Sequence, residues 1–191
     1  MMLNLEKQFT FYGAYHHNPV NLAIHIVCVP VIMLCMFQLA TNIGPQIPLA
    51  TSLSLPSLPS NLGTVSGLLY TVLYILMEPV AGSMLAPLLV SAAVFANYLT
   101  STYGTTATYW CLGIQGVLWI LQFIGHGVFE GRAPALLDNL AQAFFLAPFF
   151  VWLEVLFRLG YRPQLKARID EAVSKEIAKF KDGKDGKEGK R

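Results

Sequence analysis

The first 157 residues of this chain carry almost no charge, and that feature most limits what the chain can fold into. Only 13% of its 191 residues are Asp, Glu, Lys or Arg, whereas soluble globular proteins have about 25%. Eleven of the 13 Lys and Arg residues follow residue 157, and only Lys7 and Arg132 precede it. This composition, with 54% hydrophobic residues, predicts an integral membrane protein with a charged C-terminal extension.

Four apolar runs have the length of a membrane-spanning helix, which is about 20 residues. They cover residues 22–40, 63–81, 83–99 and 107–128, with Pro79 and Gly82 between the second and third. Residues 41–62 are uncharged and rich in Pro, Ser and Leu, which indicates a loop. The predicted fold is therefore all-α, a multi-pass membrane helix bundle of about four spans within a membrane-embedded domain over 1–163.

A fifth apolar run, residues 140–157, is interrupted by Pro148 and Glu154. Lys and Arg near span ends favour the cytosolic side, so Lys7, Arg132 and the basic tail should all lie there. Four spans that start inside satisfy this condition, whereas a fifth would carry the tail across. We therefore expect 140–157 to dip and return near Pro148, or to lie in the interface with Glu154 facing water. A full fifth span is the alternative.

The remaining segments and the cysteines further limit what kind of membrane protein this chain can be. Residues 164–191 form the cytosolic tail, predicted as a helix over 164–180 followed by a disordered stretch. No cleavable signal peptide is evident at the N-terminus. Cys28, Cys35 and Cys111 lie inside apolar runs without a CxxC pair, so we interpret them as buried apolar residues rather than zinc ligands or disulfides. No motif indicates nucleic-acid binding, and none indicates an oligomeric state.

All four histidines lie at the ends of apolar runs. His16, His17 and His25 are near the start of the first predicted span, and His126 is near the end of the fourth. The predicted topology places all four at the same face of the membrane. Polar side chains at membrane depth are costly and usually mark a functional site, and histidine is the commonest metal ligand.

The first histidine motif, YHHNPVN, combines a helix start with polar side chains. Asn18 is the predicted N-cap and Pro19 the first helical residue. Asn21 and His25 are four residues apart and share a helical face. The break before Pro19 lets His16 fold back toward His25, and Asn21 is then placed to orient an imidazole.

The second motif is QFIGHGVFEGRAP. Gln122, His126 and Glu130 are four residues apart, so they lie close to one face of a helix. Gly131 supplies a helix stop. The two motifs together predict a site at one end of the bundle.

The residues alone leave three interpretations open. Neutral imidazoles with carboxylates nearby suit iron, zinc or manganese, and ligand type does not choose among them. A metal at the mouth of an apolar bundle suits oxidation of a lipid head region, with the acyl chain between the spans, or metal-dependent hydrolysis. The alternative is a non-catalytic membrane scaffold in which the histidines hydrogen-bond the spans together.

At these residues the sequence resembles the Mpo1-like family, over most of residues 5–168. The residues that carry the resemblance are 15–19, Asn21, His25, Pro30, Trp119, 122–130, 134–139 and 159–161. The sequence is especially similar to the family's fungal member, a 2-hydroxy fatty acid dioxygenase of the endoplasmic reticulum. The resemblance implies Fe(II), O2 and the shortening of long-chain 2-hydroxy fatty acids by one carbon with release of CO2, in phytosphingosine breakdown.

The resemblance also implies roles for residues. It makes His16, His25 and His126 the iron ligands, whereas His17 occupies a more variable position. We expect Glu130 or Asp138 to be a fourth ligand or a proton acceptor, and Arg132 to pair with the substrate carboxylate. The residues expected to support the site are His17, Asn18, Asn21, Gln122, Glu130 and Asp138. The expected location is the endoplasmic reticulum membrane, with the site and both termini toward the cytosol.

Overall fold

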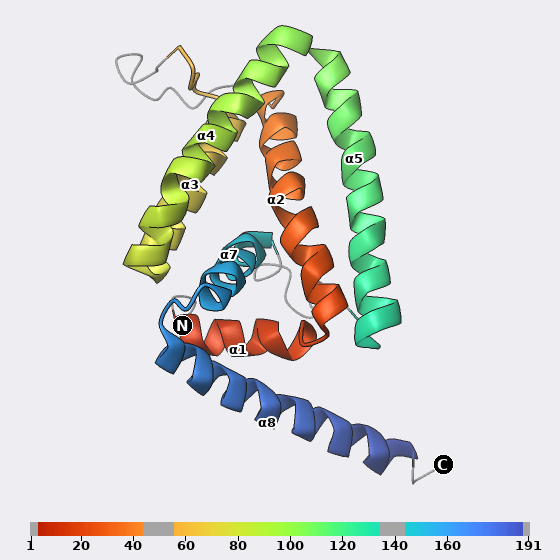
Figure 1. The fold of residues 1–191 in the computed structure, drawn as a ribbon. Helices are drawn as coiled ribbons and strands as arrows, with labels where there is room; N and C mark the ends of the chain where they lie inside the picture. Colours follow the sequence, from red (N-terminus) through yellow and green to blue (C-terminus); the bar gives the residue numbers. More distant parts are fainter. Residues whose placement is uncertain (1–3, 44–55, 134–143, 189–191) are drawn as a thin grey trace. The chain divides into compact units, whose positions relative to one another are not determined.

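The computed structural model describes residues 4–43, 56–133 and 144–188, and every element within these ranges is a helix, as predicted (Figure 1). The chain divides into two compact units. Unit 1 consists of Met1–Ala23 with Gly125–Arg191, and unit 2 of Ile24–Ile124. The predicted boundary between a membrane domain and a tail at residue 163 stays a prediction.

Four apolar helices correspond to the four predicted spans. They are α2 (Pro19–Thr41), α3 (Leu62–Met77), α4 (Pro79–Tyr103) and α5 (Thr105–Ile124). Helices α2, α4 and α5, the last with the turn that follows it, are long and apolar enough to cross a membrane, and α3 is a shorter apolar helix. Within unit 2, α3 and α4 lie side by side (Figure 1).

The break between α3 and α4 falls earlier than predicted, at Glu78. The Glu78 carboxylate accepts a hydrogen bond from the Ala81 N–H (2.5 Å) and caps α4, whose first residue is Pro79. Gly82, expected between the two runs, lies inside α4. A Cβ at Gly82 would lie 2.4 Å from the Tyr74 carbonyl oxygen, so the glycine permits the close approach of the two helices.

Buried polar side chains join the helices of unit 2 by hydrogen bonds. Asn97 Nδ2 donates to Thr64 Oγ1 (3.0 Å) and joins α4 to α3. Gln38 Nε2, on α2, donates to Thr100 Oγ1 on α4 (3.1 Å) and to Thr108 Oγ1 on α5 (3.3 Å). Such bonds stabilise helix contacts where the surroundings are as apolar as the helices themselves.

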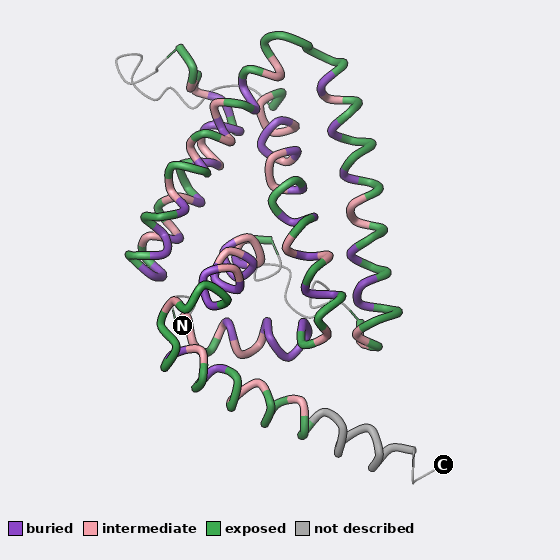
Figure 2. The backbone as a smooth tube through the Cα atoms, in the orientation of Figure 1, coloured by how far each residue is buried: buried purple, intermediate pink, exposed green. Residues whose placement is uncertain are grey.

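Apolar side chains also cover the outside of unit 2. Val27 is 68% exposed and Trp110 is 71% exposed, and exposed positions recur along the whole of α5 (Figure 2). Soluble proteins rarely expose contiguous apolar surface on this scale. The exposed faces therefore indicate association with a lipid bilayer.

Unit 1 is built from α1 (Leu5–Tyr15), the π-helical turn η2 (Gly125–Glu130), α7 (Ala147–Arg158) and α8 (Pro163–Glu188). Helix α1 packs against α8 and α7. The Phe9 ring meets the rings of Phe150 and Phe157 edge to face, at centroid distances of 5.2 and 5.4 Å. Helix α8 continues past the predicted end at residue 180 to Glu188.

Helix α7 has 12 residues and a length of about 18 Å, well short of the roughly 30 Å hydrocarbon core of a bilayer. This length agrees with a segment that does not cross by itself, while residues 134–143 lie outside the described ranges. Pro148 lies in the first turn of α7, and the expected reversal of the chain near Pro148 stays a prediction. The expectation that Glu154 faces water is wrong, because it is 8% exposed. Helix α7 is buried on most of its faces, at Phe149, Phe150, Val151, Leu153, Leu156 and Phe157.

Burial of Glu154 makes the stability of unit 1 depend on pH. Burial raises the pKa of Glu154, against the opposite effects of Lys166 and Arg158. The folded protein thus favours the protonated acid, and stability falls as pH rises above the ordinary carboxyl pKa of 4.5. We expect Glu154→Gln to raise the unfolding temperature at pH 7.5 and to leave it unchanged near pH 4. Thermal unfolding in detergent measures the unfolding temperature at both pH values. The exposed Glu171→Gln is the control and should not raise it. An equal rise for Glu154→Gln at both pH values would contradict the prediction.

Candidate metal centre

The structure brings three of the four histidines together. His16, His25 and His126 are buried, and each offers a ring nitrogen that lies within 4.8 Å of the nitrogens of the other two. The rings of His16 and His126, both in unit 1, have centroids 4.7 Å apart. The unit boundary falls inside α2, whose first turn belongs to unit 1, and His25 is two residues beyond it on the same continuous helix. We call these three residues the histidine triad.

The histidine triad fits a first-row transition metal. Metal–imidazole bonds of about 2.0–2.1 Å place ligand nitrogens roughly 3.0–3.4 Å apart around one ion. A separation within 4.8 Å reaches that arrangement with small side-chain movements. Three buried imidazoles without a thiolate can hold iron, zinc or manganese. Three protein ligands also leave positions open on the metal, which is typical of catalytic sites.

Helix α1 fixes the orientation of the His16 ring. Its Nδ1 lies 2.9 Å from the Tyr12 carbonyl oxygen, and because a carbonyl only accepts, Nδ1 carries the proton. Nε2 then presents its lone pair to a metal, the usual arrangement for a ligating histidine. The Tyr12 ring also stacks on His16, at a centroid distance of 4.1 Å. Tyr12 is not among the predicted site residues, although its position one helical turn before His16 was the available signal.

Glu130 binds the chain on both sides of the start of α2. Its side chain is fully buried. Oε1 accepts a hydrogen bond from the His17 main-chain N–H (3.1 Å), and Oε2 accepts from the Asn18 N–H (3.1 Å) and from Asn21 Nδ2 (2.9 Å). The carboxylate also forms an ion pair with His17 Nδ1. Asn18 Nδ2 donates to the Phe129 carbonyl (2.8 Å). This set of contacts, which we call the Glu130 clamp, holds the His16 end of the triad against the His126 end.

The start of α2 follows the sequence prediction. Asn18 Oδ1 accepts hydrogen bonds from the N–H groups of Val20 (2.9 Å) and Asn21 (3.4 Å), and Pro19 is the first helical residue. Asn21 Nδ2 also donates to the Tyr15 carbonyl (3.3 Å). The cap thus turns the chain where α1 ends and α2 begins, so that His16 and His25 lie on the same side.

His126 and Glu130 lie on η2, a π-helical turn that the sequence did not predict. Such turns are rare in proteins, and those that occur are often found at functional sites. Gly131 follows with a φ of +65° and ends the turn, as expected of a helix stop. Gln122 is buried one turn earlier on α5 and forms no hydrogen bond with the histidines within the described ranges.

The remaining predicted residues lie outside the triad. His17 has a side chain that is 48% exposed. Arg132 Nη1 donates to the Ala14 carbonyl (3.0 Å), and its guanidinium lies 3.5 Å from the centroid of the Tyr15 ring. Asp138 lies outside the described residues. The proposed roles of Arg132 and Asp138 in catalysis therefore stay predictions.

Comparison with known proteins matches this chain along most of its length. The profile of the family described as 2-hydroxy-palmitic acid dioxygenase Mpo1-like matches residues 2–159, which include both histidine motifs. The 2-hydroxy-palmitic acid dioxygenase MPO1 of Saccharomyces cerevisiae is 38% identical over 172 residues, which cover 88% of this chain and 89% of the yeast protein. No solved structure matches the chain significantly. With a profile match across nearly the whole chain and a relative of this similarity, the protein belongs to the Mpo1-like family.

Proposed function

We propose that this protein is an Fe(II)-dependent dioxygenase of long-chain 2-hydroxy fatty acids. The observation that carries the proposal is the buried histidine triad, in a chain 38% identical to a yeast protein named as a 2-hydroxy-palmitic acid dioxygenase. One 2-hydroxy acid and one O2 give the acid one carbon shorter, one CO2 and one water. The substrate supplies the electrons, so the reaction balances without an external reductant.

The triad would hold the iron, which when bound supplies the redox and Lewis-acid chemistry of oxygen activation. The protein's part is to present three neutral imidazoles in a fixed arrangement. The Tyr12 carbonyl holds the His16 ring, and the Glu130 clamp holds the main chain at residues 17 and 18. Burial of the triad excludes bulk water from the reacting carbon atoms.

The position of the triad along the chain suits a lipid substrate. His25 lies near the start of the candidate span α2, and His126 near the end of the span that α5 and η2 form. An acyl chain that runs along the apolar helices would place its polar end at the histidines. The basic residues outside the spans favour a cytosolic site and cytosolic termini, and we propose the endoplasmic reticulum membrane as the location.

The test is anaerobic reconstitution of the purified full-length protein with Fe(II), followed by 2-hydroxypalmitate with or without 18O2. We expect pentadecanoic acid carrying 18O only when both iron and oxygen are present, with protein loaded with Zn(II) as the inactive control. Stoichiometric iron without this product would overturn the reaction and keep the metal site. Turnover without oxygen would favour a hydrolase, and absence of both metal and turnover would favour the scaffold.

A further inference from the structure

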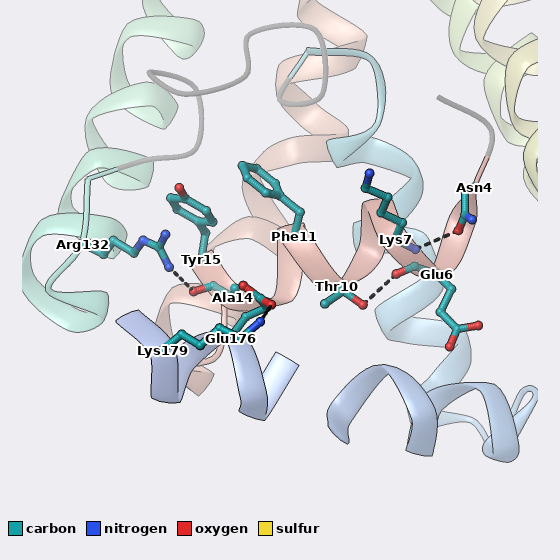
Figure 3. Close-up of a pocket in the computed structure, with 10 residues that line it drawn as sticks. All are labelled: Asn4, Glu6, Lys7, Thr10, Phe11, Ala14, Tyr15, Arg132, Glu176 and Lys179. Atoms are coloured by element: carbon teal, nitrogen blue, oxygen red, sulfur yellow. Dashed lines mark hydrogen bonds and ion pairs between the residues drawn. The ribbon is translucent and has the colours of Figure 1, made fainter. Parts of the chain in front are cut away.

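Unit 1 contains a cavity of about 780 Å³ between α1 and α8 (Figure 3). None of the histidines lines it. Its volume falls within the range of sites that take small molecules, about 300–1,000 Å³. We call it the α1–α8 cavity; the residues that matter here are Lys7, Phe11, Tyr15, Arg132 and Lys179.

The α1–α8 cavity has a surplus of positive charge. Three cations line it, Lys7, Arg132 and Lys179, against the carboxylates of Glu6 and Glu176. Both carboxylates have cationic partners. Glu6 accepts from Arg168 on α8 at 3.3 and 3.4 Å, and Glu176 accepts from Lys179 at 2.7 Å. The Lys7 ammonium forms no ion pair with any residue of the described ranges. The cavity therefore favours an anionic ligand.

One wall of the cavity is aromatic, and the Arg132 side chain packs against it. The Phe11 and Tyr15 rings lie beside each other on α1 with centroids 4.9 Å apart, and the Arg132 guanidinium lies against Tyr15 (Figure 3). The hydrogen bond to Ala14 fixes the guanidinium further. A fixed arginine suits bidentate binding of phosphate oxygens, and the rings accept apolar groups beside them. The wall and the cations together match an amphiphile with an anionic head.

The chain places this cavity beside the ends of two candidate membrane spans. Tyr15 is four residues before Pro19, where one span begins, and Arg132 is two residues after Glu130, where another ends. Residues next to span ends lie at the level of the lipid headgroups, where basic side chains attract anionic lipids. From this position we propose that the α1–α8 cavity binds the phosphodiester headgroup of an anionic phospholipid.

The proposal is tested by native mass spectrometry of the full-length protein in detergent with equimolar phosphatidylcholine and phosphatidylinositol. We expect at least a fivefold preference for phosphatidylinositol, and its loss in the double variant Lys7→Gln/Lys179→Gln. The matched control is Lys166→Gln/Lys175→Gln. It also removes two positive charges, at lysines of α8 that do not line the cavity. It should keep the preference.

Several results would overturn the proposal. One is the absence of a preference for phosphatidylinositol, and another is an equal loss in both double variants, which would indicate general attraction to the basic tail. Displacement by equimolar palmitate would assign the cavity to a carboxylate, and displacement by inorganic phosphate would assign it to a free anion. If the first double variant does not fold, a photoactivatable phosphatidylinositol on the wild-type protein must label peptides of α1 and α8. The mass of bound lipid is independent of iron and turnover, so this result and that of the proposed function are separate.

Discussion

The His126→Ala protein should fold, hold no iron and form no pentadecanoic acid. His126 supplies one of three buried ligand nitrogens that lie within 4.8 Å of one another, so its loss leaves two imidazoles and an enlarged opening. Mutation of the groups that merely orient ligands typically costs 10–100-fold in metal affinity or activity; we expect loss of a ligand itself to cost more than about 100-fold in turnover. Elemental analysis gives iron per protein, and mass spectrometry gives the product.

His17→Ala is the matched control for this loss. The His17 ring is half exposed and outside the triad. The substitution removes the contact of the ring with Glu130, whereas the hydrogen bond from the His17 main-chain N–H to Glu130 survives. The His17 variant should retain most of its iron and turnover, with helix content by circular dichroism equal in both variants and the wild type. Full iron occupancy in the His126 variant, or equal loss of iron in both, would contradict the assignment of the ligands.

Glu130→Ala should lower the affinity for iron by about 10–100-fold while leaving most of kcat at saturating iron. The substitution deprives the His17 and Asn18 N–H groups of their acceptor and removes one of the two acceptors of the Asn21 amide, which keeps the Tyr15 carbonyl. A fully buried donor left without an acceptor costs about 1–3 kcal/mol. The bond from the Asn18 N–H is partly buried and that from the His17 N–H is exposed, so the unfolding temperature should fall by less than two such losses. Turnover as a function of free Fe(II), together with thermal unfolding in detergent, measures both effects.

Glu130→Gln separates positioning from chemistry. The amide keeps the shape of the side chain and one carbonyl oxygen, so it should restore part of the iron affinity and of the stability. A carboxylate that bound iron or accepted a proton would behave differently, because neither function survives in the amide. If kcat is abolished at saturating iron in both variants, Glu130 takes part in the chemical step, and its role is not limited to holding the main chain in the clamp.

Local signals in the sequence predicted a large part of the fold and of the candidate site. Runs of apolar residues predicted the four helices of unit 2, because span length and hydropathy are local properties. The Asn18 cap and the stop at Gly131 depend on a few neighbouring residues, and the structure confirms both. The grouping of the predicted histidine ligands followed from charge and span order, which together determine the end of the bundle at which each motif lies.

The features that the sequence did not predict depend on distant partners. The π-helical turn η2 carries a carboxylate that binds main-chain groups more than a hundred positions away. The periodicity of the motif cannot predict these distant contacts. The burial of Glu154 results from the packing of α7 within unit 1, whereas its sequence neighbours suggested an interfacial helix. The α1–α8 cavity likewise requires two helices from opposite ends of the chain.

The Glu130 clamp can form only late in the synthesis of the chain. Its donors and its acceptor are 109 to 113 positions apart, and a ribosome delivers the N-terminal partner first. His16 and His25 are therefore made early and remain an incomplete site until the chain has been extended through η2. A nascent chain that stops within α5 lacks His126 and therefore lacks one member of the histidine triad. Under the proposed function, iron loading would therefore follow completion of the last apolar helix of unit 2 and would be a late step of maturation.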